Sequence, residues 1–142
     1  MILIVVLLLI NIYIFINTKQ PGELVSVKEK YRILRDHVKN IPEFKKLEQC
    51  IVISGYYHKT FGDGIGYNTN KGEEIGLCIS GTANEIFHIL LHELAHSTVD
   101  EYDHSDTFWE NYIKLRDLAI EIGIYEKIPD KKPFCGKHIQ DK

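Results

Sequence analysis

The chain has few cysteines and little net charge. The first argues against a disulfide-rich protein, and the second is examined below through the distribution of basic residues. Three cysteines occur among 142 residues, with no Cys-x-x-Cys pair, so a disulfide framework is not expected and a reducing compartment is predicted. Cys50 and Cys78 stand in apolar stretches and are predicted to be small buried hydrophobes. Ordinary shares of apolar (44%) and charged (26%) residues exclude a disordered chain, so one folded domain is expected.

Basic residues are scarce in the second half of the chain. The formal net charge is only −3, and between Asn84 and Glu126 the only basic residues are Lys114 and Arg116. Nucleic acids are bound mainly through Lys and Arg that neutralise phosphates, so this half offers no clear nucleic-acid-binding surface. The remaining basic residues lie mostly in a predicted helix before it and in the C-terminal tail, where we expect a solvated surface.

One long hydrophobic run opens the chain, MILIVVLLLINIYIFI, with Asn11 as its polar residue. As a helix it would be ~24 Å long, and the two residues after it could reach the headgroups that flank a ~30 Å hydrocarbon core. It lacks the basic start and the small residues of a signal-peptide cleavage site. We expect a transmembrane anchor over residues 1–18 and one domain over 19–142, with a cleaved signal peptide or a buried core helix as alternatives.

The residues around this run predict its orientation. No basic residue precedes it, whereas Lys19, Lys28 and Lys30 follow, and positively charged flanks tend to stay in the cytosol. The expected location is therefore a single-pass membrane protein whose domain faces the cytosol.

The rest of the chain alternates between helix and strand patterns, which predicts a small α+β domain. Thr82 and Glu85 form a capping box that starts a helix, and this helix is apolar on nearly all sides, so it should be central and buried. Glycines between residues 62 and 72 predict a turn-rich connection. The expected elements are strands over 50–57 and 73–80 and helices over 27–40, from 83, and over 106–122.

The predicted central helix contains an HExxH motif, His92-Glu93-Leu94-Ala95-His96. Residues four apart stand one turn apart on the same side of a helix, so both imidazoles can bind one metal ion. Zn²⁺ in such a site lowers the pKa of a bound water from ~15.7 to ~7, and Glu93 lies where its carboxylate can take the proton. The motif predicts a zinc site with Glu93 as general base.

A catalytic zinc site needs a third protein ligand, and His104 is the candidate because a polar stretch before it can turn the chain back. His88 shares the helix face but lies too far along it to join, so we expect it to line the cleft. We expect Asp106 to cap the last helix; the alternative is that it accepts a hydrogen bond from the far ring nitrogen of His104. Tyr102 and Tyr112 could stabilise an oxyanion or simply pack. The remaining histidines are predicted to be surface residues: His37, His58 and His138.

Three segments resemble the WLM-domain metallopeptidases, relatives of the Spartan and SprT-type proteases that degrade proteins crosslinked to DNA. They are Gly66-Tyr67-Asn68-Thr69-Asn70-Lys71-Gly72, the HELAH segment, and His104 followed by Phe108-Trp109. The resemblance spans roughly Gly62 to Tyr112. It implies a zincin-like α+β fold with a central HExxH helix and a small sheet, zinc ligands His92, His96 and His104, and Glu93 as general base.

Two departures limit what the resemblance implies. Seven residues separate His96 from His104 where the family usually has five, and Leu77-Cys78-Ile79-Ser80 replaces an arginine-rich strand end. Repair of DNA-protein crosslinks is therefore not carried over. The expected function is a zinc metalloendopeptidase acting on protein or peptide substrates, and the alternative is a membrane-anchored binding module with a structural zinc. The sequence leaves the oligomeric state open.

Overall fold

The computed structural model describes residues 1–18, 20–59 and 64–142 and confirms a small domain of mixed helix and sheet. Two residues named in the predictions lie outside the described residues. They are Lys19, which helped to predict the orientation of the N-terminal segment, and Gly62, where the resemblance begins. The elements are α1 (Ile2–Asn17), α2 (Gly22–Val38), the 3₁₀ helix η1 (Pro42–Leu47), β1 (Val52–Tyr56), β2 (Gly66–Thr69), β3 (Glu74–Cys78), α3 (Ala83–Thr98), α4 (Asp106–Glu121), β4 (Lys132–Phe134) and β5 (Lys137–Ile139).

The main sheet has the strand order β1-β3-β2, with β1 parallel and β2 antiparallel to β3. β2 was missed by the sequence analysis, which expected a turn-rich connection there. Its glycine and asparagine residues have low strand propensity, but pairing with β3 supplies the missing stabilisation. Gly76 of β3 leaves room for the Tyr67 ring, because a Cβ at Gly76 would lie 2.1 Å from Cε1 of Tyr67.

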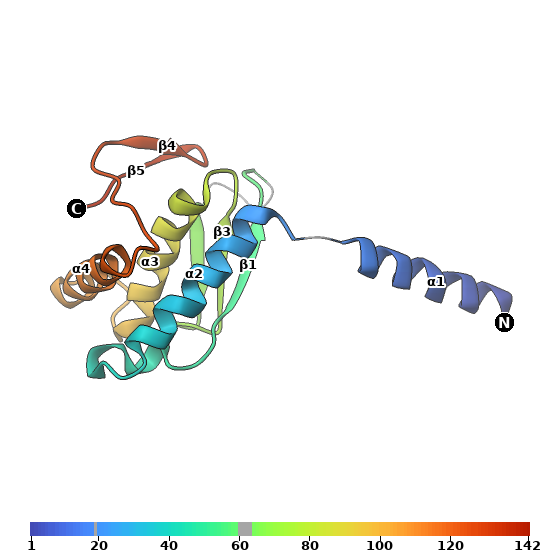
Figure 1. Ribbon diagram of the computed structural model, residues 1–142, viewed down its shortest axis with the longest axis horizontal. Coiled ribbons are helices and arrows are strands. Elements are labelled where there is room, and N and C mark those ends of the chain that lie inside the picture. Colours follow the sequence, from blue (N-terminus) through green and yellow to red (C-terminus); the bar gives the residue numbers. More distant parts are fainter. Residues whose placement is uncertain (19, 60–63) are drawn as a thin grey trace.

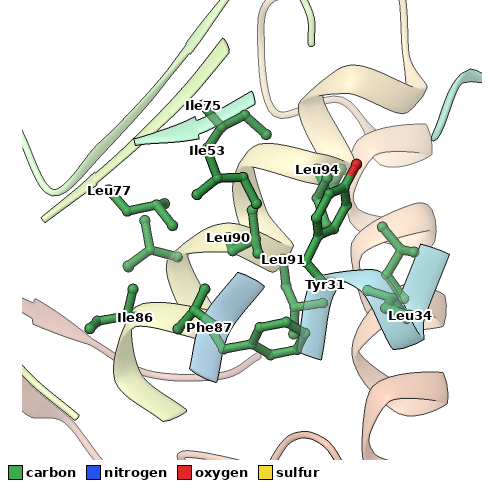
Figure 2. Packing of buried hydrophobic residues seen from close by; sticks show 14 of the residues in the cluster. Tyr31, Leu34, Ile53, Ile75, Leu77, Ile86, Phe87, Leu90, Leu91 and Leu94 are labelled. Atoms are coloured by element: carbon green, nitrogen blue, oxygen red, sulfur yellow. The ribbon is translucent and has the colours of Figure 1, made fainter. Parts of the chain in front are cut away.

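The core forms where α3 packs against the sheet on one side and against α2 and α4 on the others (Figure 1). Figure 2 shows Ile53, Ile75 and Leu77 of the sheet facing the apolar side chains of α3. Tyr31 and Leu34 of α2 close the core from the opposite direction (Figure 2). Because α3 is surrounded in this way, its charged and imidazole side chains can emerge only along the narrow face that the neighbouring elements leave open.

Helix α1 has no buried residue and projects from the rest of the chain (Figure 1). The alternative of a buried core helix is therefore wrong. Among the described residues, none of the helices has by itself the length and hydropathy of a membrane span. Helices α1 and α2 together have the length and composition of a span, but only as a pair bent by 68°.

The expectation of unpaired cysteines and the prediction of a buried Cys50 are wrong, whereas Cys78 is buried as predicted. Cys78, at the end of β3, forms a disulfide bond with Cys135, 57 residues further on, and Cys50 is exposed. The bond attaches the β4–β5 hairpin to the sheet, and the hairpin buries Phe134 and Ile139 where only a solvated basic tail was expected. Spacing along the chain carries no sign of this contact, because it exists only once the tail has folded back over the domain.

Candidate metal centre

The capping box predicted from the sequence starts α3. The Thr82 hydroxyl accepts from the amide of Glu85 (3.3 Å), and the Glu85 carboxylate accepts from the amide of Thr82 (2.8 Å). This start sets the helix register, so that His92 and His96 stand one turn apart on the open face of α3. Their ring centroids are 4.9 Å apart.

His104 approaches the same point from the segment that follows α3. Its Nε2 lies 3.0 Å from Nε2 of His92 and 3.1 Å from Nε2 of His96. Ligands around a tetrahedral zinc at ~2.0–2.1 Å are about 3.3–3.4 Å apart, close to these separations. The ligand atoms of the three residues all lie within 4.8 Å of one another. The structure therefore brings together the three histidines that the sequence singled out, in an arrangement that fits a metal ion.

The protonation states of two of these histidines also fit a metal ion. Burial, together with the neighbouring imidazoles, lowers the pKa of His92 to about 3. Burial, followed by His104 and Lys71, lowers the pKa of His96 to about 4. Both rings are thus neutral at physiological pH, which is the form in which imidazole binds metals. Three imidazoles sharing one position is the ligand set of catalytic zinc sites with an open coordination position.

Glu93 is buried beside this cluster, and burial raises the pKa of its carboxyl to about 7. Strand β2 lies close over it, because a Cβ on Gly66 would come within 2.6 Å of Ile89 Cγ2 and 3.1 Å of Glu93 Oε1. Glycine at position 66 is therefore what allows β2 to cover the helix here. Two cavities, of about 200 and 220 Å³, meet at Glu93, the first reaching His96 and the second His92.

Two residues that the sequence analysis quoted only as part of a resemblance hold the site together. The Asn68 side-chain amide donates to the carbonyl of Glu93 (2.8 Å) and to Oγ of Ser97 (2.7 Å), which ties β2 to α3. Lys71 Nζ donates to the carbonyl oxygens of Val99 (2.9 Å) and Glu101. These carbonyls belong to the turn that leads from α3 to His104, so Lys71 fixes the path by which the third histidine returns.

Replacing Lys71 with methionine should weaken metal binding without removing a ligand. Methionine keeps the length of the side chain but leaves the carbonyls of the turn before His104 without their donor. Residues that orient metal ligands are typically worth ~10- to 100-fold in affinity, and we expect a loss in this range from competition with a chromophoric chelator. Lys114→Met, which breaks an exposed 3.1 Å pair with Glu43, is the matched control and should leave affinity unchanged. Equal affinities in the two variants would contradict this role for Lys71.

Other sequence candidates lie elsewhere. Ser105, not Asp106, caps α4, accepting from the amide of Phe108 at 3.2 Å, so the expected Asp106 cap is wrong. The Tyr112 hydroxyl is buried and donates to Asp141 (2.6 Å), which leaves it no proton for an oxyanion. Tyr102 is 84% exposed at the rim of the first cavity.

The histidines outside the cluster follow the predictions with one exception. His88 is not among the converging residues of the described chain and lines the second cavity, as expected. His37 and His138 are exposed. His58 is half-buried, and its Nδ1 is enclosed without a hydrogen-bond partner in the described part of the chain, so its prediction as a surface residue is wrong.

Alanine at position 104 should lower zinc affinity by at least ~100-fold, because the site then keeps two of its three imidazoles. The measurement is a zinc titration against a competing chelator, with bound metal counted per chain. His37→Ala serves as the control, since His37 is an exposed histidine on α2 whose contact is the nearby carbonyl of Ile33. If both variants bind zinc like the wild type, His104 is not a ligand.

Comparison with known proteins places the chain beside one curated sequence. A protein described as "Uncharacterized protein R325", from Acanthamoeba polyphaga mimivirus, is 28% identical over 132 residues, which cover 82% of this chain and 66% of that protein. The chain thus spans just under two thirds of that relative's length. No family model and no solved structure matches. The printed name assigns no activity, and the resemblance to WLM-domain peptidases stays a prediction.

Proposed function

We propose that this protein is a zinc-dependent metalloendopeptidase. The observation that carries the proposal is the meeting of three imidazole Nε2 atoms beside a buried carboxylate at the junction of two cavities. His92, His96 and His104 would hold the ion. When bound, zinc supplies a Lewis acid that polarises a peptide carbonyl and acidifies water.

Glu93 is placed to handle the proton in this reaction. Its carboxylate accepts a proton from the attacking water and returns it to the nitrogen of the leaving amine. A pKa of about 7 suits a group that must both take and give a proton near neutral pH. The cavities on either side of Glu93 provide room for substrate residues before and after the cleaved bond.

The proposal includes a zincin-like arrangement of the WLM type. Its support is that the quoted segments meet in space. Trp109 packs on the His104 ring with centroids 5.6 Å apart, and Phe108 packs on His96 at 4.4 Å. Asn68 from the glycine-asparagine segment is bonded to α3 as described above. A shared use for all three segments favours the resemblance over chance occurrence of HExxH.

We also propose that α1 attaches the domain to a membrane. All of its large apolar side chains are exposed, and within its bounds the sequence contains no charged residue. The disulfide removes one argument for a cytosolic domain, since the prediction of a reducing compartment rested on unpaired cysteines. Co-flotation of the full chain with phosphatidylcholine vesicles, and its loss when residues 1–18 are removed, would support attachment. Equal flotation of both forms would oppose it.

The enzyme is separated from the rival binding module by activity, not by metal content. The full chain, loaded with one equivalent of zinc, is incubated with an unfolded protein and a peptide library, and cleavage products are identified by mass spectrometry. We expect cleavage that stops with a chelator and returns with added zinc. Stable zinc binding with no cleavage of any substrate would instead favour the binding module.

A further inference from the structure

A buried polar cluster lies one helical turn before the zinc ligands. His88 Nδ1 lies 2.9 Å from the hydroxyl of Tyr125, 3.4 Å from that of Tyr112 and 3.5 Å from Oδ1 of Asp141. Asp141 also accepts from the amide of Ile128 (2.7 Å), and its side chain is fully buried. Nothing in the proposed proton transfer by Glu93 uses this cluster.

The hydrogen-bond donors in the cluster determine whether Nδ1 of His88 carries a proton. The Tyr112 and Tyr125 hydroxyls both donate to Asp141, at 2.6 and 2.5 Å. Burial alone would raise the pKa of Asp141, but its hydrogen bonds to His88, Tyr112, Tyr125 and Ile128 outweigh it and hold the pKa well below the usual range. Asp141 is therefore a carboxylate and has no proton to give.

Each tyrosine has one hydroxyl proton, which it uses in its hydrogen bond to Asp141. The Tyr125 oxygen can then only accept from His88, so Nδ1 must carry a proton. The other ring nitrogen, Nε2, takes no part in these hydrogen bonds.

Nε2 of His88 is not sealed inside the protein. In the described part of the chain it has no hydrogen-bond partner, and it is not among the fully enclosed polar atoms. His88 lines the second cavity together with His92 and Glu93. Residues 138–140 also line it, and its apolar part comes from Ile65, Ile89 and Ile139. A concave site with a few converging polar groups, here His88, His92 and Glu93, is a common form of a ligand site.

The separation of His88 from His92 corresponds to about two residues of an extended peptide. Residues 88 and 92 are separated by about 6 Å along the helix axis, whereas an extended peptide advances about 3.3–3.6 Å per residue. An extended substrate that runs along α3 with its scissile carbonyl at His92 therefore presents a peptide group near His88, about two residues from the scissile bond. We infer that His88 is a substrate-contacting residue, whose Nε2 hydrogen-bonds the main chain of a peptide substrate about two residues from the scissile bond; this rests on the proposed peptidase function.

The test uses two substitutions that each keep one end of the imidazole. Asparagine places its amide nitrogen where Nδ1 lies and retains the donor to Tyr125 but removes Nε2. Glutamine places its terminal amide where Nε2 lies and retains a polar group in the cleft. We expect His88→Asn to keep one zinc per chain and a wild-type melting temperature while kcat/KM for a cleaved peptide falls roughly 10- to 100-fold. His88→Gln should recover at least part of that loss.

Each result decides the question. Wild-type kcat/KM in His88→Asn would overturn the inference alone, and so would a loss that accompanies loss of zinc or of stability in both variants, because His88 would then be structural. A smaller kcat/KM in His88→Gln than in His88→Asn would show that the contact with Tyr125 matters and Nε2 does not. Absence of cleavage by the zinc-loaded wild type would overturn the peptidase proposal and this inference together.

Discussion

Glu93→Gln is expected to lose nearly all peptide cleavage while retaining one zinc per chain. The substitution keeps the shape of the side chain but removes the group that accepts the proton of water in the proposed reaction. General base catalysis typically contributes ~10²- to 10⁴-fold, and we expect a loss at or above the upper end because the same carboxylate returns the proton to the leaving amine. The measurement is kcat on a peptide identified with the wild type, with zinc determined on the same samples.

Stability should not fall in this variant. Burial raises the pKa of Glu93 to about 7, because the buried surroundings favour the neutral carboxyl over the charged carboxylate more than water does. The neutral amide of glutamine has the same size and avoids the free-energy cost of burying a charge. Glu110→Gln, an exposed glutamate on α4, is the matched control and should cleave like the wild type. If Glu93→Gln also cleaves at the wild-type rate, Glu93 is not the base.

Loss of the Cys78–Cys135 disulfide should lower the free energy of unfolding by about 4 kcal/mol, because the bond closes a loop of nearly sixty residues in the unfolded chain. For a domain of this size that is a fall in melting temperature of roughly 10–20 °C. Thermal unfolding with and without a dithiol reductant, under a metal-saturating condition, measures it. The double variant Cys78→Ala with Cys135→Ala should melt like the reduced wild type.

Cys50→Ala is the control for this experiment. Cys50 is exposed and outside the bond, so its removal should leave the melting curve unchanged. Thiol titration of the unfolded, unreduced chain should find one free thiol, and three after reduction. Three free thiols without reductant, in protein purified under air, would show that the bond does not form. Peptide cleavage should fall along with stability on reduction, because the hairpin next to Cys135 forms one wall of the second cavity.

The site combines one contiguous element with several distant ones. His92, Glu93 and His96 come from a single helical turn and a half, so their mutual placement follows from helix geometry alone. His104 arrives after a turn whose path depends on Lys71, more than twenty residues earlier in the chain. The second cavity, beside His92 and Glu93, is also lined by residues 138–140, from a hairpin held by the disulfide. Each step away from α3 depends more on tertiary contacts.

The sequence by itself determined the features that local rules govern. The capping box at Thr82, the all-round apolar character of α3 and the HELAH spacing together predicted a buried helix with two histidines on one face, and the structure has this helix. The predictions for the helix succeed because helix register propagates over four-residue spacings without help from the rest of the chain. His104 also reaches the cluster, but by a turn that Lys71 holds.

The tertiary structure alone decided the strand β2, the disulfide and the cluster around His88. Gly66 and Asn68 lie in a strand because β3 pairs with β2, and Gly66 allows β2 to approach α3 closely. Cys78 meets Cys135, and Asp141 meets Tyr112 and Tyr125, only after the C-terminal hairpin has folded over the domain. Such contacts join residues that are far apart in the chain, and no spacing rule connects them, because they depend on where the packed core directs the chain.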